Sequence, residues 1–251
     1  MNILLTNDDG IDFPGLSILR EELQSIGKVF VFAPTREKSG TSQALSIFDD
    51  VYVQPLDKNT FIVNGYPVDC INIGLHGGLI HEPVDIIVSG INKGVNMGDD
   101  IYYSGTVGAA RHGFIHGYPS LAVSCGYLDE NGDYASVSKF VKSFIEENAS
   151  LFKKPVLLNI NHPVPAKNVS GIKWTKLGRR IYRDTYKKTR INKQEYYFNL
   201  GGSELSHKEE KGTDFEAYEN NYVSITPLKR DATDYEIFDK EYKPDRFKTG
   251  N

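Results

Sequence analysis

Short runs of consecutive apolar residues, separated by segments of helical periodicity, constrain the fold of this 251-residue chain most strongly. The first two runs are residues 2–6 and 29–33, and between them Leu16, Leu19 and Leu23 recur at helical spacing. A strand that is apolar throughout is buried on both faces, which is typical of parallel strands covered by helices on either side. The pattern therefore predicts an α/β fold with a doubly wound, mostly parallel sheet.

The same alternation continues to about residue 170. Further helices are predicted at 67–76, 106–116 and 134–150, and the first helix is expected to stop at Gly27. Further strands are predicted at residues 51–54, 61–63, 85–89, 121–124, 156–160 and 222–228. A chain of this length can bury a complete core without disulfides or structural zinc.

The sequence changes character after residue 170, where basic and β-type residues replace the apolar runs. Residues 171–193, with the segment that follows the polar turn at 192–194, are predicted to form a long β-hairpin arm. Its basic residues are interpreted as a protected strand edge or a subunit contact rather than a phosphate-binding surface. The predicted division is an α/β catalytic core (1–170), the β-hairpin arm with a return strand to the core (171–228), and a polar C-terminal extension that wraps a neighbour or frays (229–251).

Composition and charge exclude several classes of function. The net charge of −4 gives no basic field for a nucleic-acid duplex. No apolar stretch approaches the ~20 residues that span a bilayer, and the N-terminus lacks the basic and apolar regions of a signal peptide. Cys70 and Cys125 have neither zinc-site nor C-x-x-C spacing and are interpreted as core thiols. We therefore expect a cytoplasmic protein with no membrane partner.

Polar residues follow the predicted strands at the edge where a doubly wound sheet binds its ligands. Asp8 and Asp9 come directly after the first strand, and two adjacent carboxylates repel each other unless a cation lies beside them. Mg²⁺ or Mn²⁺ prefers such oxygen ligands and can polarise a phosphoryl oxygen or activate water. Asp-Asp-Gly is also a common surface turn. Its place after a buried strand favours the metal site.

Two more loops bring polar groups to the same edge. Ser39 follows the second strand, and Asn92 and Asn96 follow the strand predicted at 85–89. Two Asp carboxylates, a Ser hydroxyl and an Asn carbonyl would supply four oxygen ligands. Taken singly these residues are weak signals, because Ser-Gly pairs mark many loops and an Asn side chain can simply bond its own backbone.

Ser104, Gly105 and Thr106 lead into the helix predicted at 106–116. A helix N-terminus offers free backbone N–H groups and a positive dipole end, which together suit a phosphate group. An ordinary N-cap at Ser104 or Thr106 is the alternative, and the two roles are compatible. The chain has no Walker A loop there, no G-x-G-x-x-G after the first strand and no G-x-S-x-G elbow. Of the six histidines, His112 alone is expected near this site, about one turn into the helix.

Five stretches of the chain carry a resemblance to a known family. They are ILLTNDDGIDFPG, AP followed by KSGTSQALS, VNGYPVDC, SGINKGVNMGDDIYYSGTVGAARHG and GTDFEAYENNYVSITPL. In this order they resemble the SurE family of stationary-phase survival 5′/3′-nucleotidases. Together they span residues 3–228, which is nearly the whole chain. One departure is His112, at a position where the family pattern is expected to carry Glu.

The resemblance implies a cytoplasmic metallophosphatase with a Rossmann-like core. Members hydrolyse nucleoside 5′- and 3′-monophosphates, and some also trim short polyphosphate. It also implies homodimers or homotetramers formed through a protruding β-hairpin and an exchanged C-terminal segment. One divalent cation per subunit, Mg²⁺ or Mn²⁺, is expected to be held by Asp8, Asp9, Ser39 and Asn92. Asp8 and Asp9 are then also the catalytic residues, and the expected substrate contacts are Asn96, Ser104, Gly105 and Thr106.

Several alternatives stay open at this point. The attacking group is a metal-bound water or, as the second choice, an Asp carboxylate that forms a phosphoenzyme. A non-catalytic nucleotide sensor would use the same phosphate site, but a pure anion binder gains little from the pair Asp8 and Asp9. A sugar-nucleotide transferase also uses acidic pairs and Mn²⁺. It would need a second acceptor site, for which the sequence offers no support.

Overall fold

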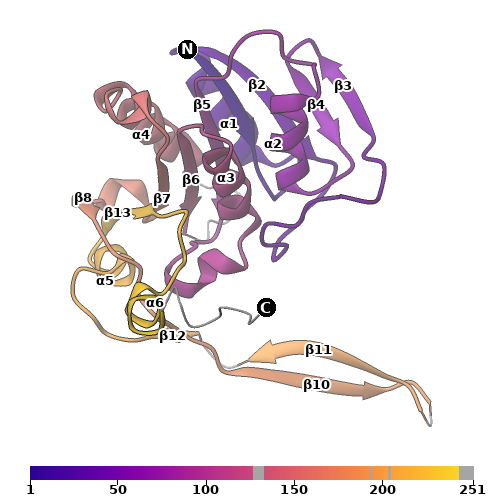
Figure 1. Ribbon diagram of the computed structural model, residues 1–251, viewed down its shortest axis with the longest axis vertical. Coiled ribbons are helices and arrows are strands. Elements are labelled where there is room, and N and C mark those ends of the chain that lie inside the picture. Colours follow the sequence, from indigo (N-terminus) through magenta and orange to yellow (C-terminus); the bar gives the residue numbers. More distant parts are fainter. Residues whose placement is uncertain (127–132, 193, 203–204, 243–251) are drawn as a thin grey trace, which may run out of the picture.

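A nine-stranded sheet forms the centre of the molecule (Figure 1). The computed structural model describes residues 1–126, 133–192, 194–202 and 205–242. The strands of the central sheet are β1 (Asn2–Thr6), β2 (Lys28–Pro34), β3 (Val53–Asp57), β4 (Thr60–Val63), β5 (Ile86–Lys93), β6 (Ser120–Cys125), β7 (Leu157–His162), β8 (Gly171–Trp174) and β13 (Tyr222–Leu228). Their order across the sheet is β3-β4-β2-β1-β5-β6-β7-β13-β8.

Parallel pairing dominates this sheet. β1 pairs in parallel with β2 on one side and with β5 on the other. The parallel arrangement continues from β2 to β4 and from β5 through β6 to β7, whereas β3 and β13 run antiparallel to β4 and β7. The prediction of a doubly wound, mostly parallel sheet is confirmed. The strand order reverses between β1 and β5, which is where such sheets bind ligands.

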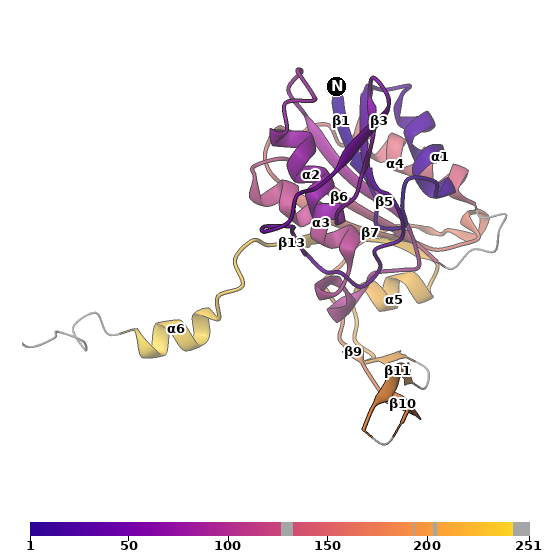
Figure 2. The ribbon, with the colours of Figure 1, turned by 90° about the vertical axis from the view of Figure 1, so that its right-hand side faces the viewer.

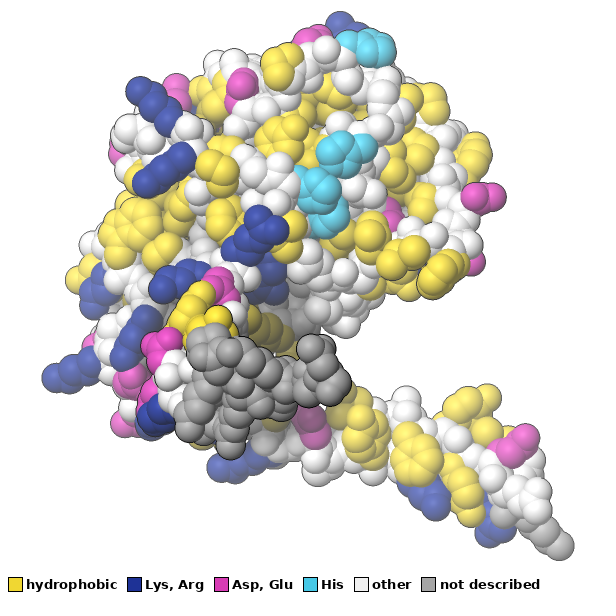
Figure 3. Space-filling model, viewed as in Figure 1, with side chains coloured by type: hydrophobic (Ala, Val, Ile, Leu, Met, Phe, Trp, Pro, Cys, Tyr) yellow, Lys and Arg dark blue, Asp and Glu magenta, His cyan; other side chains and the backbone are white. Residues whose placement is uncertain are grey.

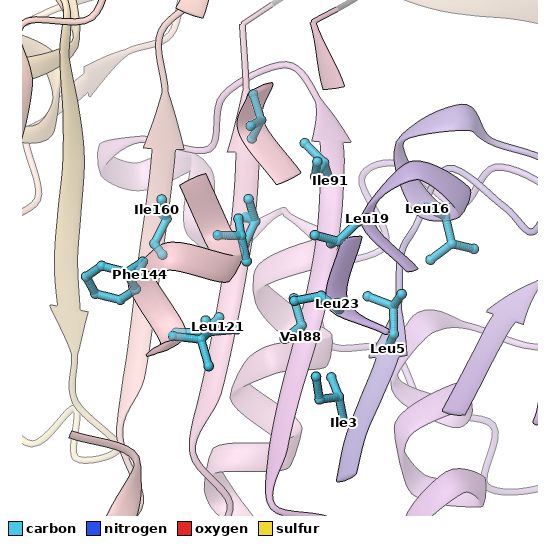
Figure 4. Close-up of a cluster of buried hydrophobic side chains, with 14 of the residues drawn as sticks. Ile3, Leu5, Leu16, Leu19, Leu23, Val88, Ile91, Leu121, Phe144 and Ile160 are labelled. Carbon is cyan, nitrogen blue, oxygen red and sulfur yellow. The ribbon is translucent and has the colours of Figure 1, made fainter. Parts of the chain in front are cut away.

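Helices cover both faces of the sheet, which explains why its strands are apolar throughout. The main helices are α1 (Pro14–Leu23), α2 (Pro67–His76), α3 (Gly105–Ile115) and α4 (Tyr134–Glu147). Leu5 of β1 packs with Leu19 and Leu23 of α1 on one face (Figure 4), while its neighbour Leu4 packs with Ile71 of α2 on the other. Successive side chains of a strand point to opposite faces, so both positions must be apolar.

The remaining helices are short. They are the 3-10 turns η1 (Gly98–Tyr102), η2 (Leu151–Lys153) and η3 (Ala166–Asn168), and the helices α5 (Asp214–Glu219) and α6 (Tyr235–Glu241). Over the described ranges, the helices are all too short or too polar to cross a membrane.

Two element ends differ from the sequence predictions. Helix α1 ends at Leu23 rather than Gly27, because the chain turns over Gln24–Ile26 before β2. Strand β5 continues past the predicted segment 85–89 to Lys93. Its register with β6 shifts after Ser89, and the pairing then resumes. Asn92 and Lys93, which are polar, therefore remain in the strand and lie at the carboxyl edge of the sheet.

The arm is a two-stranded antiparallel hairpin that projects away from the core (Figures 1 and 2). It consists of β10 (Asp184–Arg190) and β11 (Tyr196–Gly202), and the short pair β9 (Arg180–Ile181) and β12 (Ser206–His207) lies at its root. The prediction that the arm begins at residue 171 is wrong for β8. That strand pairs in parallel with β13 and supplies hydrogen-bond partners for an otherwise open sheet edge.

A helix forms in the C-terminal extension, where none was predicted. Asp234 caps α6 by accepting a hydrogen bond from the N–H of Ile237 at 3.0 Å. Tyr235, Phe238 and Tyr242 recur at helical spacing, and all three rings are largely exposed. Figure 2 shows α6 lying apart from the sheet. The exchange of this segment between subunits stays a prediction, and residues 243–251 lie outside the described part of the chain.

His112 lies in the packing between α3 and α2. Its Nε2 is 3.4 Å from Oδ1 of Asn72, and its ring centroid is 4.4 Å from that of His116. Nε2 of His76 lies 3.1 Å from Nδ1 of His116, so three histidines form one cluster; Figure 3 shows histidines grouped on this face. Burial first, and then the nearby His116 and His76, lower the pKa of His112 to about 4, although Asp69 opposes the shift.

We predict that His112 makes the fold sensitive to acid. An unfolded His takes up a proton near pH 6.5, whereas folded His112 does so only near pH 4. Between these values the unfolded chain binds more protons, so the free energy of unfolding falls as the pH drops through this window. In urea denaturation at pH 7 and pH 4.5, His112→Gln should remove on the order of 2 kcal/mol of this fall.

The exposed His81 provides the matched control for that measurement. His81→Gln should leave the pH dependence of unfolding as it is in the unmodified chain. The prediction would be contradicted if the free energy of unfolding of His112→Gln fell between pH 7 and pH 4.5 by as much as that of the unmodified chain.

Candidate active site

A cavity of about 720 Å³ opens at the carboxyl ends of β1 and β5, where the strand order of the sheet reverses. Predicted site residues from four separate segments of the chain meet at its wall. Those among the predicted site residues are Asp8, Ser39, Asn92, Asn96 and Ser104. Asp9 and Gly105 directly follow Asp8 and Ser104 in the chain, and Thr106 follows Gly105. The structure therefore brings the predicted set together.

The loop after β1 is a buried turn closed by the side chain of Asn7. Its Nδ2 donates to the carbonyl of Gly10 at 2.9 Å, and its Oδ1 accepts from the N–H of Gly10 at 3.3 Å. Gly10 has a φ of 103°, and a Cβ there would lie 3.1 Å from the backbone of Arg36. The turn requires glycine for both reasons. It fixes the two residues between Asn7 and Gly10, which are Asp8 and Asp9.

Asp8 is held against the start of α3. Asp8 is only 3% exposed, and its Oδ1 accepts a hydrogen bond from the hydroxyl of Thr106. A Cβ on Gly105 would lie 2.9 Å from Oδ2 of Asp8, so glycine permits the close approach. Burial raises the pKa of Asp8, although hydrogen bonds from the hydroxyl and backbone of Thr106 lower it in part. Thr106 thus positions Asp8.

Asp9 carries the second carboxylate of the site. Its Oδ2 accepts a hydrogen bond from the backbone N–H of Lys93, at the end of β5, at 3.3 Å. Burial first, and then the charge of Asp8, raise the pKa of Asp9 to about 7. The two carboxylates are therefore under-compensated by the protein, and a cation beside them would relieve their repulsion.

Ser39 and Asn92 present oxygen atoms at the same cavity. The hydroxyl of Ser39 donates to Oε1 of Glu37 at 2.7 Å, which uses its hydrogen but leaves lone pairs on the oxygen. The Nδ2 of Asn92 donates to the carbonyl of Gly94 at 2.8 Å. Its amide nitrogen is thereby engaged, and its amide oxygen is the group that can serve a cation. Both side chains are suited to the role predicted for them.

Asn96 is fixed by two amide side chains of β7 that the sequence did not single out. The N–H of Asn96 donates to Oδ1 of Asn161 at 2.8 Å, and its carbonyl accepts from Nδ2 of Asn161 at 3.0 Å and of Asn159 at 2.8 Å. Its own Nδ2 lies 2.8 Å from Oγ of Ser124 in β6. Asn159 and Asn161 are fully buried. This amide clamp locks the loop after β5 onto the two neighbouring strands.

Ser104 is the N-cap of α3, which is one of the two roles predicted for it. Its Oγ accepts a hydrogen bond from the N–H of Val107 at 3.1 Å. A Cβ on Gly108 would meet the carbonyl of Ser42, so the loop after β2 also packs closely on the first turn of α3. The positive end of this eleven-residue helix lies beside the carboxylate of Asp8.

Comparison with known proteins identifies the family to which this site belongs. The family model described as "Survival protein SurE" matches residues 3–184. The chain belongs to the SurE family. A Leptospira interrogans protein named 5′-nucleotidase SurE is 49% identical over 238 residues, covering 94% of this chain and 95% of that protein. A Syntrophomonas wolfei protein of the same name is 39% identical, covering 97% of this chain and 94% of that one.

The fold of this SurE chain is shared with a solved structure of the family. The crystal structure of the SurE protein from Aquifex aeolicus is 34% identical and has a TM-score of 0.82. The match covers 96% of this chain and 98% of the other, so the two folds agree almost throughout. The family resemblance predicted from five sequence stretches is confirmed.

The structure of this SurE chain changes two of the sequence predictions. Thr106 was expected to contact substrate, but its side chain is fully buried and its hydroxyl bonds Asp8. His112 was expected near the site, but it lies between α2 and α3. The clamp residues were missed because Asn159 lies inside the core strand predicted at 156–160 and Asn161 directly follows it. Their one signal was the presence of two amides at alternate positions in an otherwise apolar run.

The amide clamp should stabilise the fold of this SurE chain measurably. Asn161→Ala leaves the buried N–H of Asn96 without its acceptor, which costs about 1–3 kcal/mol for an unpaired buried donor. The free energy of unfolding, measured by urea denaturation, should fall by that amount. Asn199→Ala on the exposed arm is the control and should change little. An Asn161→Ala variant as stable as the unmodified chain would contradict the clamp.

Proposed function

We propose that this chain is a divalent-metal-dependent phosphatase that hydrolyses nucleoside 5′- and 3′-monophosphates to nucleoside and phosphate. The observation that carries the proposal is the pair of carboxylates, Asp8 and Asp9, at a cavity of about 720 Å³. Family membership supports a hydrolase of phosphate monoesters, because the similar proteins are named 5′-nucleotidase. Short polyphosphate is a further proposed substrate, since removal of its terminal phosphoryl group needs the same contacts.

One divalent cation per subunit, Mg²⁺ or Mn²⁺, is the cofactor in this proposal. The donor set fits such an ion, because Asp8, Asp9, Ser39 and Asn92 all offer hard oxygen atoms. Within the described residues, no group of three or more His, Cys, Asp or Glu side chains is arranged to hold a metal ion. The proposed set contains only two residues of those types. When bound, the cation polarises a phosphoryl oxygen and offsets the charge that develops during displacement.

The chain's own groups hold and orient the phosphate. Ser104 and Gly105 begin α3, whose N-terminus favours an anionic oxygen, and Asn96 offers an amide from the clamped loop. Thr106 acts through Asp8, which it keeps in one position. Because these groups are fixed before substrate arrives, little orientational entropy is lost at the moment of reaction.

A water molecule is the attacking group that we favour over an Asp carboxylate. Its oxygen forms a bond to phosphorus on the side opposite the ester oxygen, and the P–O bond to the nucleoside breaks. One proton of the water stays with the phosphate and the other ends on the nucleoside oxygen. Asp8 is held in place by Thr106, which suits a group that stays fixed during turnover rather than one that becomes esterified.

We also propose a cytoplasmic homodimer or homotetramer. Large exposed apolar side chains support this, because such patches mark protein contacts. They extend along the arm (Figure 3) and also lie on α6, where a neighbouring subunit would cover them if this segment is exchanged. The side chains concerned are Tyr186, Tyr197, Phe198, Leu200, Tyr235, Phe238 and Tyr242. The cytoplasmic location rests on the family resemblance.

Replacing one carboxylate tests the proposed function directly. Asp8→Asn should lower kcat for a nucleoside 5′-monophosphate by at least ~100-fold, the scale of losing a principal electrostatic group. The measurement is phosphate release at saturating Mg²⁺ or Mn²⁺. Asp12→Asn, an exposed residue just beyond the turn, is the matched control and should retain activity. Near-normal turnover of Asp8→Asn would contradict the assignment.

A further inference from the structure

The cavity extends well beyond the proposed phosphate site, toward the root of the arm. Its volume of about 720 Å³ lies within the range of pockets that enclose an organic ligand, and a phosphate group fills only part of it. Away from Asp8, aromatic and aliphatic side chains line the wall together with the charged residues Asp100, Arg180 and Asp184. The aromatic and aliphatic side chains among them are Tyr103, Tyr182, Leu200, Leu205 and Tyr218.

Two of these tyrosines form a corner of the cavity. The ring centroids of Tyr103 and Tyr182 are 5.9 Å apart, and the ring planes meet at 83°. Tyr103 is 61% exposed and Tyr182 is 38% exposed, so ring surface is accessible on both. Tyr103 directly precedes Ser104, the cap of α3, which places the corner beside the proposed phosphate contacts.

The second ring is held rigidly at the root of the arm. The hydroxyl of Tyr182 donates to Oδ1 of Asp100 at 2.9 Å, and Nε of Arg180 donates to Oδ2 of the same carboxylate at 3.0 Å. The guanidinium of Arg180 also lies over the ring of Phe215, 4.5 Å from its centroid. Because the phenol hydrogen is already donated, Tyr182 offers the cavity its ring rather than its hydroxyl.

We propose that Tyr103 and Tyr182 form the nucleobase subsite of this enzyme, and that the root of the arm closes it. The inference rests on the proposed function, because the phosphate must lie at the Asp8 end for the base to reach the corner. Every base has an aromatic face, so recognition by stacking tolerates all of them and favours the larger purines. The arm therefore contributes to the site of its own subunit as well as to the proposed assembly.

The test compares two substrates that differ only by the base. Ribose 5-phosphate carries the same phosphate ester as a purine nucleoside 5′-monophosphate but lacks the ring that would stack. Tyr103→Ala and Tyr182→Ala should each raise KM for the nucleotide about tenfold. Both variants should leave kcat/KM for ribose 5-phosphate unchanged. Tyr103→Phe keeps the ring and leaves the hydrogen bond between Tyr182 and Asp100 intact, so it should retain the nucleotide KM.

Tyr52→Ala serves as the control, because Tyr52 is exposed and lies outside both the lining of the cavity and the side chains proposed for the assembly. If the Ala variants lost kcat/KM equally for both substrates, the subsite would be overturned and the rings would have a structural role. Unchanged KM values for the nucleotide would overturn it as well. No phosphate release from either substrate by the unmodified protein would overturn the proposed function itself, and the subsite with it.

Discussion

The contact between Thr106 and Asp8 is the interaction on which the candidate site depends, because it joins the end of β1 to the start of α3. A buried carboxylate is costly unless donors or a cation lie beside it. Thr106 supplies donors, and Gly105 lets the helix approach closely enough for them to reach. The adjacent Asp9, in the turn between Asn7 and Gly10, then adds a second carboxylate, which Lys93 compensates only in part.

The parallel sheet determines where the other groups of the site lie. Neighbouring parallel strands end at the same edge, so the segment after β5 arrives beside the turn after β1. There β7 holds Asn96 through the amides of Asn159 and Asn161, β6 holds it through Ser124, and the arm root adds Tyr182 to the cavity wall. Polar groups fixed in this way are oriented before any ligand binds, which is the arrangement that electrostatic catalysis requires.

Much of this arrangement could be predicted from the sequence, because the apolar runs identify the buried strands and Asp8 and Asp9 directly follow the first. The clamp could not be predicted, since the hydrogen bonds between Asn96 and Asn161 join residues 65 positions apart in the chain. The sheet strand β8 and the helix α6 were also missed. Short segments have weak periodicity, and their structure depends on partners such as β13 that local sequence does not reveal.

The central claim is that phosphate release requires a divalent cation at the paired carboxylates. It is tested most directly by stripping the protein with EDTA and measuring phosphate release from nucleoside 5′-monophosphates before and after Mg²⁺ or Mn²⁺ is returned. We predict that release stops after stripping and recovers with added metal. Full phosphate release from the stripped protein would contradict the claim. Nucleotide that binds in the presence of Mg²⁺ or Mn²⁺ but is not hydrolysed would contradict it as well.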